Sequence, residues 1–567
     1  MTRCIQFSLL LGLASMVIPA SVAAAADGPT IRNPIIRGDW SDPALIKVGD
    51  DFYTCRSTFG WQPGIPIAHS RDLVHWRVIG HAFDSRDDIV PGDTRNGIWG
   101  LDMGFNPNTR RFLIYAPMRN HSIYVYHADR PEGPYAVTKL GDSLGIDPGF
   151  FADADGRLYL VVSRAVIYEL EPDGLAIRRE VSRLDRSRYR FFEGPSLVKR
   201  GDWYYLLFSD GGTLPREPST ISSLRARSLE GPWEEDPANP ILFATDAGST
   251  FEGPAHGTLI EVTSGDWFVA FHAHEVAYQS LGRQMLLSPV TWTDAGWWTV
   301  ATGRIPQENV RAPDLAPAPV AWRQSDEFAG PELGLQWFFL GPPDRSGAAW
   351  SLRERPGVLR LRAQPGDLAS TRSLPGVVQQ RVTEKRFTIT TRVEFEAGAP
   401  GEMAGLHLYH DPGMNLWIAS SASDGRPAVV VGATDLGIAA EQTRVPHEFG
   451  DAIWLRIAVD GAESATFHFS GDGETWIRVG EPVYFGASGH HLRDGRRGAP
   501  DLGWVGRYKD RSLEATPAAD RDARWERARR GNVWTATTMG LFAVSGDAPP
   551  GRSAEFDFFR VNSEPTQ

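Results

Sequence analysis

The chain has 567 residues, a formal net charge of -12, 42% hydrophobic residues and 23% charged residues. This composition is typical of a folded globular protein and excludes an intrinsically disordered chain. The acidic balance argues against nucleic acid as a partner, and the length predicts two domains of ordinary all-β size.

Residues 1–26 predict a secretory signal. Arg3 is the only charged residue in this segment, an apolar run follows at Phe7–Leu13, and small residues precede Asp27. After this segment no apolar run is long enough to cross a bilayer, so we expect a soluble chain exported to the periplasm or the medium. Cys55 is then the only cysteine, which excludes an internal disulfide.

A carboxylate followed by a hairpin recurs five times between residues 27 and 305, which predicts a catalytic domain built from repeats. In the fourth copy Glu193 precedes an apolar strand, a turn at Arg200–Asp202 and the aromatic strand Trp203–Phe208. A period of 45 to 60 residues predicts the blades of a five-bladed β-propeller, whose first strands line a central channel. The acids expected near one end of this channel are Asp42, Asp102, Asp147, Glu193 and Glu252.

The second half of the chain predicts a different β domain. Residues 306–321 are rich in proline and predict a semi-rigid linker. From residue 322 to 567, stretches such as Phe387–Val393 and Ile453–Val459 alternate in polarity, which predicts a β-sandwich of jelly-roll or concanavalin-like type. Gly486–Gly531 breaks this alternation and predicts a long excursion with room for a short helix.

Three of the five acids are the strongest candidates for chemistry. Hydrolysis of a glycosidic bond needs one carboxylic acid to protonate the leaving oxygen and one carboxylate to activate water. Like charges gathered in a cleft raise one another's pKa values, so folding stability alone does not explain such a cluster. Asp42, Asp147 and Glu193 fit this chemistry. For Asp102 and Glu252, hydrogen bonds to backbone N–H groups at a turn are a sufficient explanation.

Histidines follow the fifth acid. His256 is a candidate ligand for a calcium or sodium ion in the channel, because the site has a surplus of carboxylates. His272 and His274 alternate along a strand, but a zinc site would need three or four ligands without other roles. We expect these two side chains to be packed or hydrogen-bonded.

Five segments in chain order resemble glycoside hydrolase family 43, and its β-xylosidases in particular. They are SDPALIKVGDDFYT, STFGWQPGIPIAHSRDLVHW, IDPGFFADADGRLYLV, FFEGPSLVKRGDWYYLLFS and GRQMLLSPVTW. The resemblance covers nearly the whole mature chain and implies a five-bladed propeller joined to a concanavalin-like sandwich. It also implies an inverting exo-glycosidase that removes β-D-xylosyl or α-L-arabinofuranosyl residues from plant-wall oligosaccharides, with no cofactor needed for the chemistry.

The resemblance assigns a role to each of the three acids. Asp42 matches the general base, Glu193 the general acid, and Asp147 the acid that raises the pKa of the general acid and orients it. Inversion requires the two working carboxyl groups to be roughly 6.5–9.5 Å apart, with room for a water between them.

The resemblance also implies substrate contacts. Arg283 matches a substrate-contacting arginine, and Phe59 and Trp61 lie in the loop that resembles the aromatic wall of the pocket. Trp99 belongs to a second-blade motif that departs from the family, which has Ala-Pro where this chain has Gly100-Leu101. This departure bears on the leaving-group side of the pocket.

Asp326 and Asp557, near the two ends of the sandwich, are candidate ligands of a structural calcium in the style of the family. The sandwich resembles a domain that closes over the catalytic cleft. Within the family, an α-L-arabinofuranosidase or a galactosidase is an alternative specificity. From other classes, a sialidase-like propeller and a non-catalytic carbohydrate-binding propeller are the alternatives; the first is disfavoured because its box-like motif SGDGETW occurs once, outside the repeats.

Overall fold

The protein is analysed as a computed structural model, which describes most of residues 29–563. The gaps within this range are 84–96, 119–120, 188, 190, 212–218, 245–248, 277, 322, 343, 345, 369–373, 400, 412–413, 436–437 and 486–535. The predicted signal (1–26) and the predicted excursion (486–531) therefore lie outside the described residues. The described part contains the short 3-10 helix η2 (Gln279–Leu281), and no helix of this part is long and apolar enough to span a membrane.

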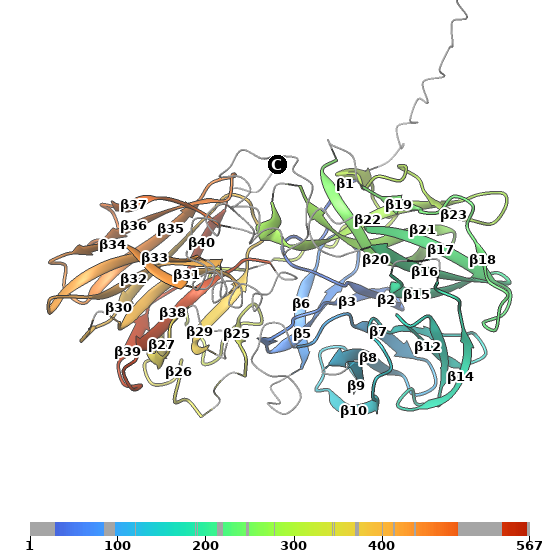
Figure 1. Ribbon diagram of the computed structural model, residues 1–567, viewed down its shortest axis with the longest axis horizontal. Helices are drawn as coiled ribbons and strands as arrows, with labels where there is room; N and C mark the ends of the chain where they lie inside the picture. Colours follow the sequence, from blue (N-terminus) through green and yellow to red (C-terminus); the bar gives the residue numbers. More distant parts are fainter. Residues whose placement is uncertain are drawn as a thin grey trace, which may run out of the picture.

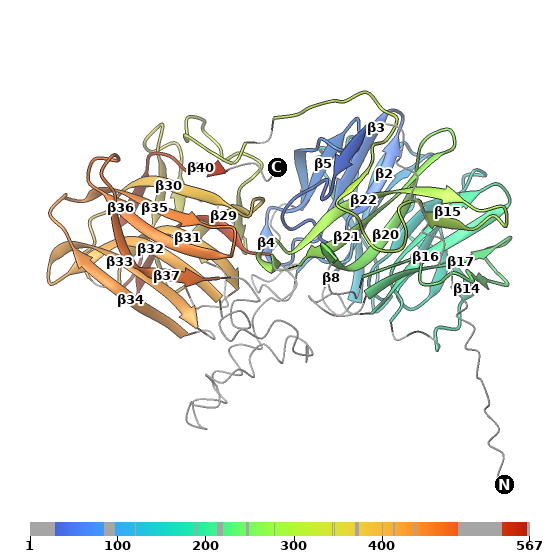
Figure 2. The same ribbon diagram turned by 90° about the horizontal axis from the view of Figure 1, so that it is seen from above.

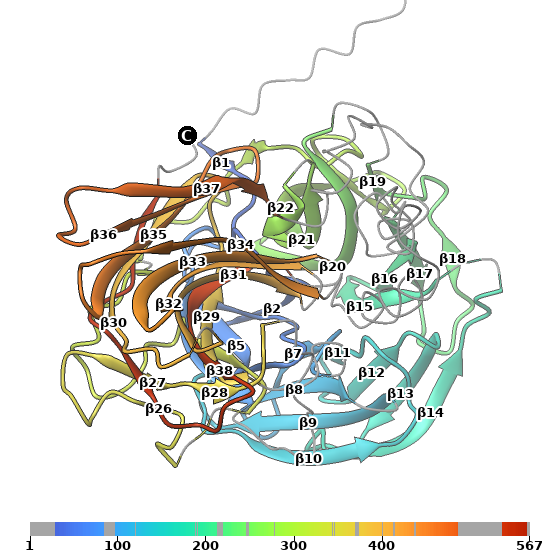
Figure 3. The same cartoon turned by 60° about the vertical axis from the view of Figure 1, so that its left-hand side comes forward.

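The first half of the chain forms five antiparallel sheets around a common axis, which confirms the predicted propeller. Figure 3 shows their first strands β2, β7, β11, β15 and β20 around this axis. Each predicted hairpin supplies the first two strands of a blade.

The strands of blades 1 to 3 follow one another along the chain. They are β2 (Ala44–Val48), β3 (Asp51–Cys55), β5 (Gly64–Ser70) and β6 (Arg77–Phe83); β7 (Asp102–Asn106), β8 (Arg111–Met118), β9 (Ser122–Ala128) and β10 (Ala136–Gly141); and β11 (Gly149–Ala152), β12 (Leu158–Val162), β13 (Val166–Leu170) and β14 (Ile177–Arg183).

Blades 4 and 5 contain both the longest and the shortest strands of the blades. They are β15 (Glu193–Arg200), β16 (Trp203–Gly211), β17 (Ser219–Ala226), β18 (Glu234–Glu235) and β19 (Leu242–Phe243); and β20 (Phe251–Thr263), β21 (Asp266–Glu275), β22 (Arg283–Trp292) and β23 (Trp298–Val300).

Hydrophobic residues of the propeller are buried between neighbouring blades. Each adjacent pair of blades encloses one cluster, and the ring closes where Leu45 and Phe52 of blade 1 pack with Ile260 and Phe268 of blade 5. Cys55 is fully buried in the cluster between blades 1 and 2. The axis itself is therefore left to other side chains.

A short ribbon joins the two ends of the propeller sequence. Strand β1 (Thr30–Arg32) pairs with β24 (Asn309–Arg311), and Asn33 Nδ2 donates to the Gln307 carbonyl. The segment 306–321, predicted as a linker, thus contains a strand that pairs with the start of the propeller. Val310 is 2% exposed, so burial of this side chain and the ladder hydrogen bonds outweigh the prolines around it.

The second half of the chain forms two stacked, mainly antiparallel sheets, which confirms the predicted sandwich (Figure 1, left). One sheet contains β25 (Phe338–Leu340), β28 (Gln364–Pro365), β29 (Leu374–Arg381), β31 (Met403–Asp411), β32 (Met414–Ser423), β33 (Arg426–Asp435), β34 (Ile438–Pro446) and β38 (Thr538–Gly546). The other contains β26 (Trp350–Ser351), β27 (Leu359–Arg362), β30 (Phe387–Glu394), β35 (Ala452–Val459), β36 (Ser464–Ser470), β37 (Ile477–Tyr484), β39 (Ser553–Phe556) and β40 (Arg560–Ser563).

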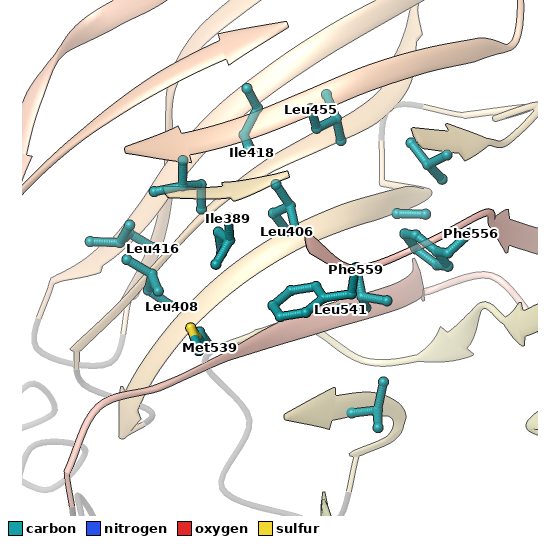
Figure 4. Packing of buried hydrophobic residues seen from close by; sticks show 14 of the residues in the cluster. Ile389, Leu406, Leu408, Leu416, Ile418, Leu455, Met539, Leu541, Phe556 and Phe559 are labelled. Carbon is teal, nitrogen blue, oxygen red and sulfur yellow. The ribbon is translucent and has the colours of Figure 1, made fainter. Parts of the chain in front are cut away.

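One continuous core lies between the two sheets of the sandwich. Alternate residues of each strand enter it, as Leu406 and Leu408 of β31 do. Figure 4 shows them close to Leu541 of β38 and to Ile389 and Leu455 of the opposite sheet.

The sandwich extends one of its sheets into the propeller. Strand β4 (Trp61–Gln62) comes from blade 1 but pairs with β25, and Gly341 N–H donates to the Gly60 carbonyl at 2.9 Å. Figure 2 shows β4 at the boundary between the two domains. The loop before β5 is therefore fixed by both domains.

Candidate active site

A cavity of about 250 Å³ lies where the first strands of the blades begin. Asp42 precedes β2, Asp147 precedes β11, and Glu193 is the first residue of β15. In the described part of the chain its lining residues all come from the propeller. They are Asp42, Phe59, Trp99, Ile146, Asp147, Glu193, Gly194, Ser209, Ala255, His256, His272 and Arg283.

Asp42 is a buried carboxylate with a partner on each oxygen. Arg283 Nη1 donates to Oδ1 at 2.6 Å, and Ser57 Oγ donates to Oδ2 at 2.6 Å. Burial alone would raise the pKa of Asp42, but the Arg283 charge and the Ser57 hydrogen bond hold this pKa well below its usual value. Asp42 is therefore ionised at neutral pH.

His272 is a neutral ring that accepts a hydrogen bond from the backbone of Asp42. The Asp42 backbone N–H donates to His272 Nδ1 at 3.0 Å, so Nδ1 is an acceptor and the ring proton is on Nε2. Burial, helped by the Arg283 charge, lowers the pKa of His272 well below its usual value. The Arg283 charge is therefore the largest of the charges that lower the pKa of Asp42, ahead of that of His256.

Asp147 has the opposite electrostatic environment. Burial, together with the negative charges of Glu193 and Asp42, raises the pKa of Asp147 to about 7. Asp147 Oδ2 accepts the N–H of Gly194, the residue after Glu193, at 2.9 Å. Asp147 thus holds the backbone that carries Glu193, and the pocket contains one acid that is ionised at neutral pH and one that keeps its proton up to about pH 7.

Left-handed backbone is concentrated at this site. Asp42, Asp147 and His256 have φ values of 53°, 48° and 53°. Residues other than glycine rarely adopt this region, and such strain is characteristic of functional sites. His256 is held there by its N–H, which donates to Ser209 Oγ at 2.8 Å, and its Nδ1 lies 3.8 Å from Asp42 Oδ1.

The predicted wall residues separate into two groups. Phe59, Trp99 and Arg283 line the cavity, whereas Trp61 does not. Trp61 is 3% exposed and packs edge to face against Phe338 of the sandwich, with ring centroids 5.0 Å apart. The chain turns between the two aromatics because Phe59 has a φ of 52°, so the two side chains do not share one face as in an extended strand.

The five repeated acids do not all meet in the cavity. Asp102 and Glu252 are absent from its described lining. Gly100, with a φ of 57°, stands where a Cβ atom would lie 1.9 Å from Asp147 Oδ1. The second blade therefore places backbone against Asp147, and its acid enters β7, where Asp102 Oδ2 accepts Phe150 N–H at 2.7 Å.

The residues expected to bind metals have protein partners instead. Asp326 accepts hydrogen bonds from Phe328 N–H and Trp337 Nε1, and Asp557 pairs with Arg392 at 2.6 Å. These oxygens face donors, so the two acids do not fit a shared calcium site. Throughout the described residues, no group of three or more His, Cys, Asp or Glu side chains is placed to hold a metal. A hydrated calcium or sodium ion held only in part by His256 needs no such group and stays a prediction.

Residues for which the sequence predicted no contact with the catalytic acids also shape the site. Ser57, Gly100 and Gly194 each contact one of the two aspartates through a hydroxyl, a Cα or a backbone N–H. Gly194 could have been noticed from its place beside Glu193. Gly100 reaches Asp147 from the neighbouring blade, and Ser57 reaches Asp42 from the other end of the first hairpin of the same blade. Neither residue lies beside its aspartate in the sequence.

Both domains match known family profiles. Residues 31–298 match the profile described as glycosyl hydrolases family 43, and residues 325–509 match the β-xylosidase C-terminal concanavalin A-like domain. Among solved structures, a family 43 protein from Bacillus licheniformis is similar with a TM-score of 0.80 and 27% identity, covering 94% of this chain and 99% of that one.

Two curated relatives extend the comparison. A xylan 1,3-β-xylosidase of Vibrio sp. is 29% identical over 498 residues, which is 80% of this chain and 90% of the relative. A non-reducing end α-L-arabinofuranosidase of Bacteroides ovatus is 32% identical over 404 residues, 67% of this chain and 74% of the relative. Together with the acid pocket at the propeller axis, these matches show that the chain is a glycoside hydrolase and belongs to glycosyl hydrolase family 43.

Proposed function

We propose that the protein is an inverting exo-glycosidase that releases terminal β-D-xylosyl or α-L-arabinofuranosyl residues from plant-wall oligosaccharides. One observation carries this proposal: a single buried pocket contains Asp42, held ionised, and Asp147, held protonated beside Glu193. Two carboxyl groups kept in opposite states are what acid–base hydrolysis of a glycoside requires. The two sugars are supported by the names of the relatives, a xylosidase and an arabinofuranosidase.

In this mechanism Asp42 is the general base. The Asp42 carboxylate, kept ionised by Arg283, accepts a proton from a water molecule as that water attacks the anomeric carbon. The grip of Arg283 and Ser57 on the two carboxylate oxygens fixes the direction of the remaining lone pairs. A fixed base reduces the entropy lost on reaching the transition state.

Glu193 is the general acid, and Asp147 supports it. Asp147 keeps its proton up to about pH 7 and holds the Glu193 backbone through Gly194 N–H. The proton held at this pair is available to the leaving oxygen through Glu193, so the bond to the aglycone breaks without a free alkoxide. Neither step requires a cofactor.

The pocket walls support an exo mode of action. A volume of about 250 Å³ is at the small end of ligand cavities, which suits one terminal sugar. Phe59 and half-buried Trp99 supply aromatic surface for the sugar ring, and Arg283 supplies a polar contact. Trp61 acts indirectly, since it anchors the loop that carries Phe59 in the sandwich.

The decisive experiment compares aryl β-xylosides, α-arabinofuranosides and galactosides, with the anomer of the first product followed by NMR. We expect xylose or arabinose with inverted configuration. A retained configuration contradicts the mechanism, and binding of xylo-oligosaccharides without release of a monosaccharide would identify a non-catalytic protein.

The roles of the two working acids are separated by leaving group. Glu193→Ala is expected to lose at least about 1000-fold in kcat on unactivated glycosides but far less on activated aryl glycosides, which need no protonation. Asp42→Ala is expected to lose a similar factor on both substrates, because water activation is required in both. Equal losses for the two variants on the two substrates contradict the assignment.

A further inference from the structure

Ser57 joins the active-site carboxylate to the second blade. It is fully buried and follows β3, and its hydroxyl makes two hydrogen bonds. Oγ donates to Asp42 Oδ2 at 2.6 Å and accepts Gly100 N–H at 2.7 Å. The direction of both bonds is fixed, because an N–H can only donate and an ionised carboxylate can only accept.

This hydroxyl completes the grip on Asp42. Arg283 Nη1 binds Oδ1, and Ser57 binds Oδ2, so each oxygen has one short charge-assisted hydrogen bond. With Arg283 alone the carboxylate could rotate about its bond to Cβ. With both partners its plane is fixed while it still faces the cavity.

The second hydrogen bond extends this grip to the opposite side of the pocket. Gly100 directs its N–H to Ser57, and its Cα faces Asp147 so closely that a Cβ would lie 1.9 Å from Asp147 Oδ1. The preceding residue, Trp99, lines the cavity. The backbone between Trp99 and Gly100 therefore lies between the two aspartates. It is hydrogen-bonded to Asp42 through Ser57 on one side and packs against Asp147 on the other.

We propose that Ser57 is a positioning residue for the reaction: its hydroxyl fixes the plane of the Asp42 carboxylate and ties it to the backbone that carries Trp99. This inference rests on the proposed function, in which Asp42 activates water. It adds a residue from blade 1 that touches neither the sugar nor the attacking water.

The test uses Ser57→Ala and Ser57→Thr in the full-length chain, with Ser288→Ala as the control. Ser288 is fully buried on β22, its hydroxyl has no hydrogen-bond partner among the described residues, and it is not part of the described cavity lining. We expect Ser57→Ala to lower kcat about 10- to 100-fold with KM changed less than about threefold. The factor should be the same for good and poor leaving groups, because water activation by Asp42 is required for both.

Ser57→Thr retains the hydroxyl and is expected to recover most of kcat, and Ser288→Ala should behave as the unsubstituted protein. A loss in Ser57→Ala that appears in KM, that depends on the leaving group, or that Ser288→Ala reproduces overturns the proposal.

A crystal structure of Ser57→Ala gives a readout that does not depend on the sugar. We expect the Asp42 carboxylate to rotate away from its original plane and the Trp99–Gly100 backbone to shift. An Asp42 carboxylate that keeps its plane overturns the positioning role even if the protein hydrolyses xylosides. Conversely, a rotated carboxylate supports the role even if the panel of substrates identifies a different sugar.

Discussion

The sandwich has one continuous hydrophobic core between its two sheets and a second cluster around Trp61 of β4, whereas the propeller has five separate cores between neighbouring blades. The propeller axis, where the blades converge, is left with buried polar groups such as Asp42, Arg283 and His272. It also contains left-handed backbone at Asp42 and Asp147. Burial of hydrophobic side chains between the blades stabilises the propeller. The side chains at the axis are not needed for this packing and can serve catalysis.

This difference implies that substitutions in the cores and substitutions at the axis affect different properties. Substitutions in a hydrophobic core should change the free energy of unfolding and leave kcat intact, because packing there is remote from the reacting atoms. Substitutions at the axis should change kcat, and some should stabilise the fold, because buried charge and strain are unfavourable for folding. Three further experiments test this division.

The largest expected effect is on stability in the sandwich. Leu541 is fully buried in the continuous core, so Leu541→Ala is expected to lower the free energy of unfolding by about 2–5 kcal/mol. At a temperature where the variant is folded, kcat on an aryl glycoside should be unchanged. Urea unfolding followed by circular dichroism measures the first quantity and initial rates measure the second. Leu541→Met, which conserves volume, is the control and should cost less than about 1.5 kcal/mol.

Much of this architecture was predictable from the repeated hairpins. An acid before an apolar strand, a turn and an aromatic strand recurs with the period of propeller blades, and Asp42, Asp147 and Glu193 do meet in one cavity. The short strand β24 was not predictable, because three residues among prolines are too few to show alternation. Its pairing with β1 is a contact between distant segments.

The errors at the site have a common physical cause. Phe59 and Trp61 were read as neighbours on one wall, but the left-handed backbone at Phe59 sends Trp61 into the sandwich. Asp102 was expected near the channel, with capping of backbone as a sufficient role; its carboxylate does accept a backbone N–H, that of Phe150, while Gly100 takes the place beside Asp147. Ser57 had no signal, since its partner Gly100 comes from another blade. Local patterns predict elements, and these three features depend on how elements meet.

A substitution of Asp102 tests whether a buried carboxyl group near the axis lowers the free energy of unfolding even when it lies outside the cavity lining. Burial raises the pKa of Asp102 to about 7. The folded state therefore binds this proton more tightly than the unfolded state, and stability falls as pH rises from about 4 to 7. Asp102→Asn stays neutral and keeps an acceptor for Phe150 N–H. We expect it to be more stable than the unsubstituted protein at pH 8, by an amount on the order of 2–4 kcal/mol, and equal at pH 4.

Thermal unfolding at the two pH values measures this difference. Asp202→Asn is the matched control, because the Asp202 side chain is 88% exposed, and it should change stability at neither pH. A destabilised Asp102→Asn at pH 8 would show that the ionised carboxylate is worth more to the fold than its burial costs. The axis would then resemble the cores in its contribution to stability.

The smallest expected effect lies at the contact between the two domains. There a residue of the sandwich should influence the pocket, which is an exception to the separation between stability in the cores and catalysis at the axis. Phe338 packs on Trp61, and β25 pairs with β4, so the sandwich holds the loop that carries Phe59. An aromatic pair is worth about 0.5–1.5 kcal/mol, and only part of this reaches the pocket. Phe338→Leu is therefore expected to raise KM about two- to threefold with kcat unchanged. Phe467→Leu, inside the continuous core, should lower stability without changing KM. If both variants raise KM equally, general loosening explains the effect; if only Phe338→Leu does, the sandwich shapes the pocket wall through a strand that it shares with the propeller.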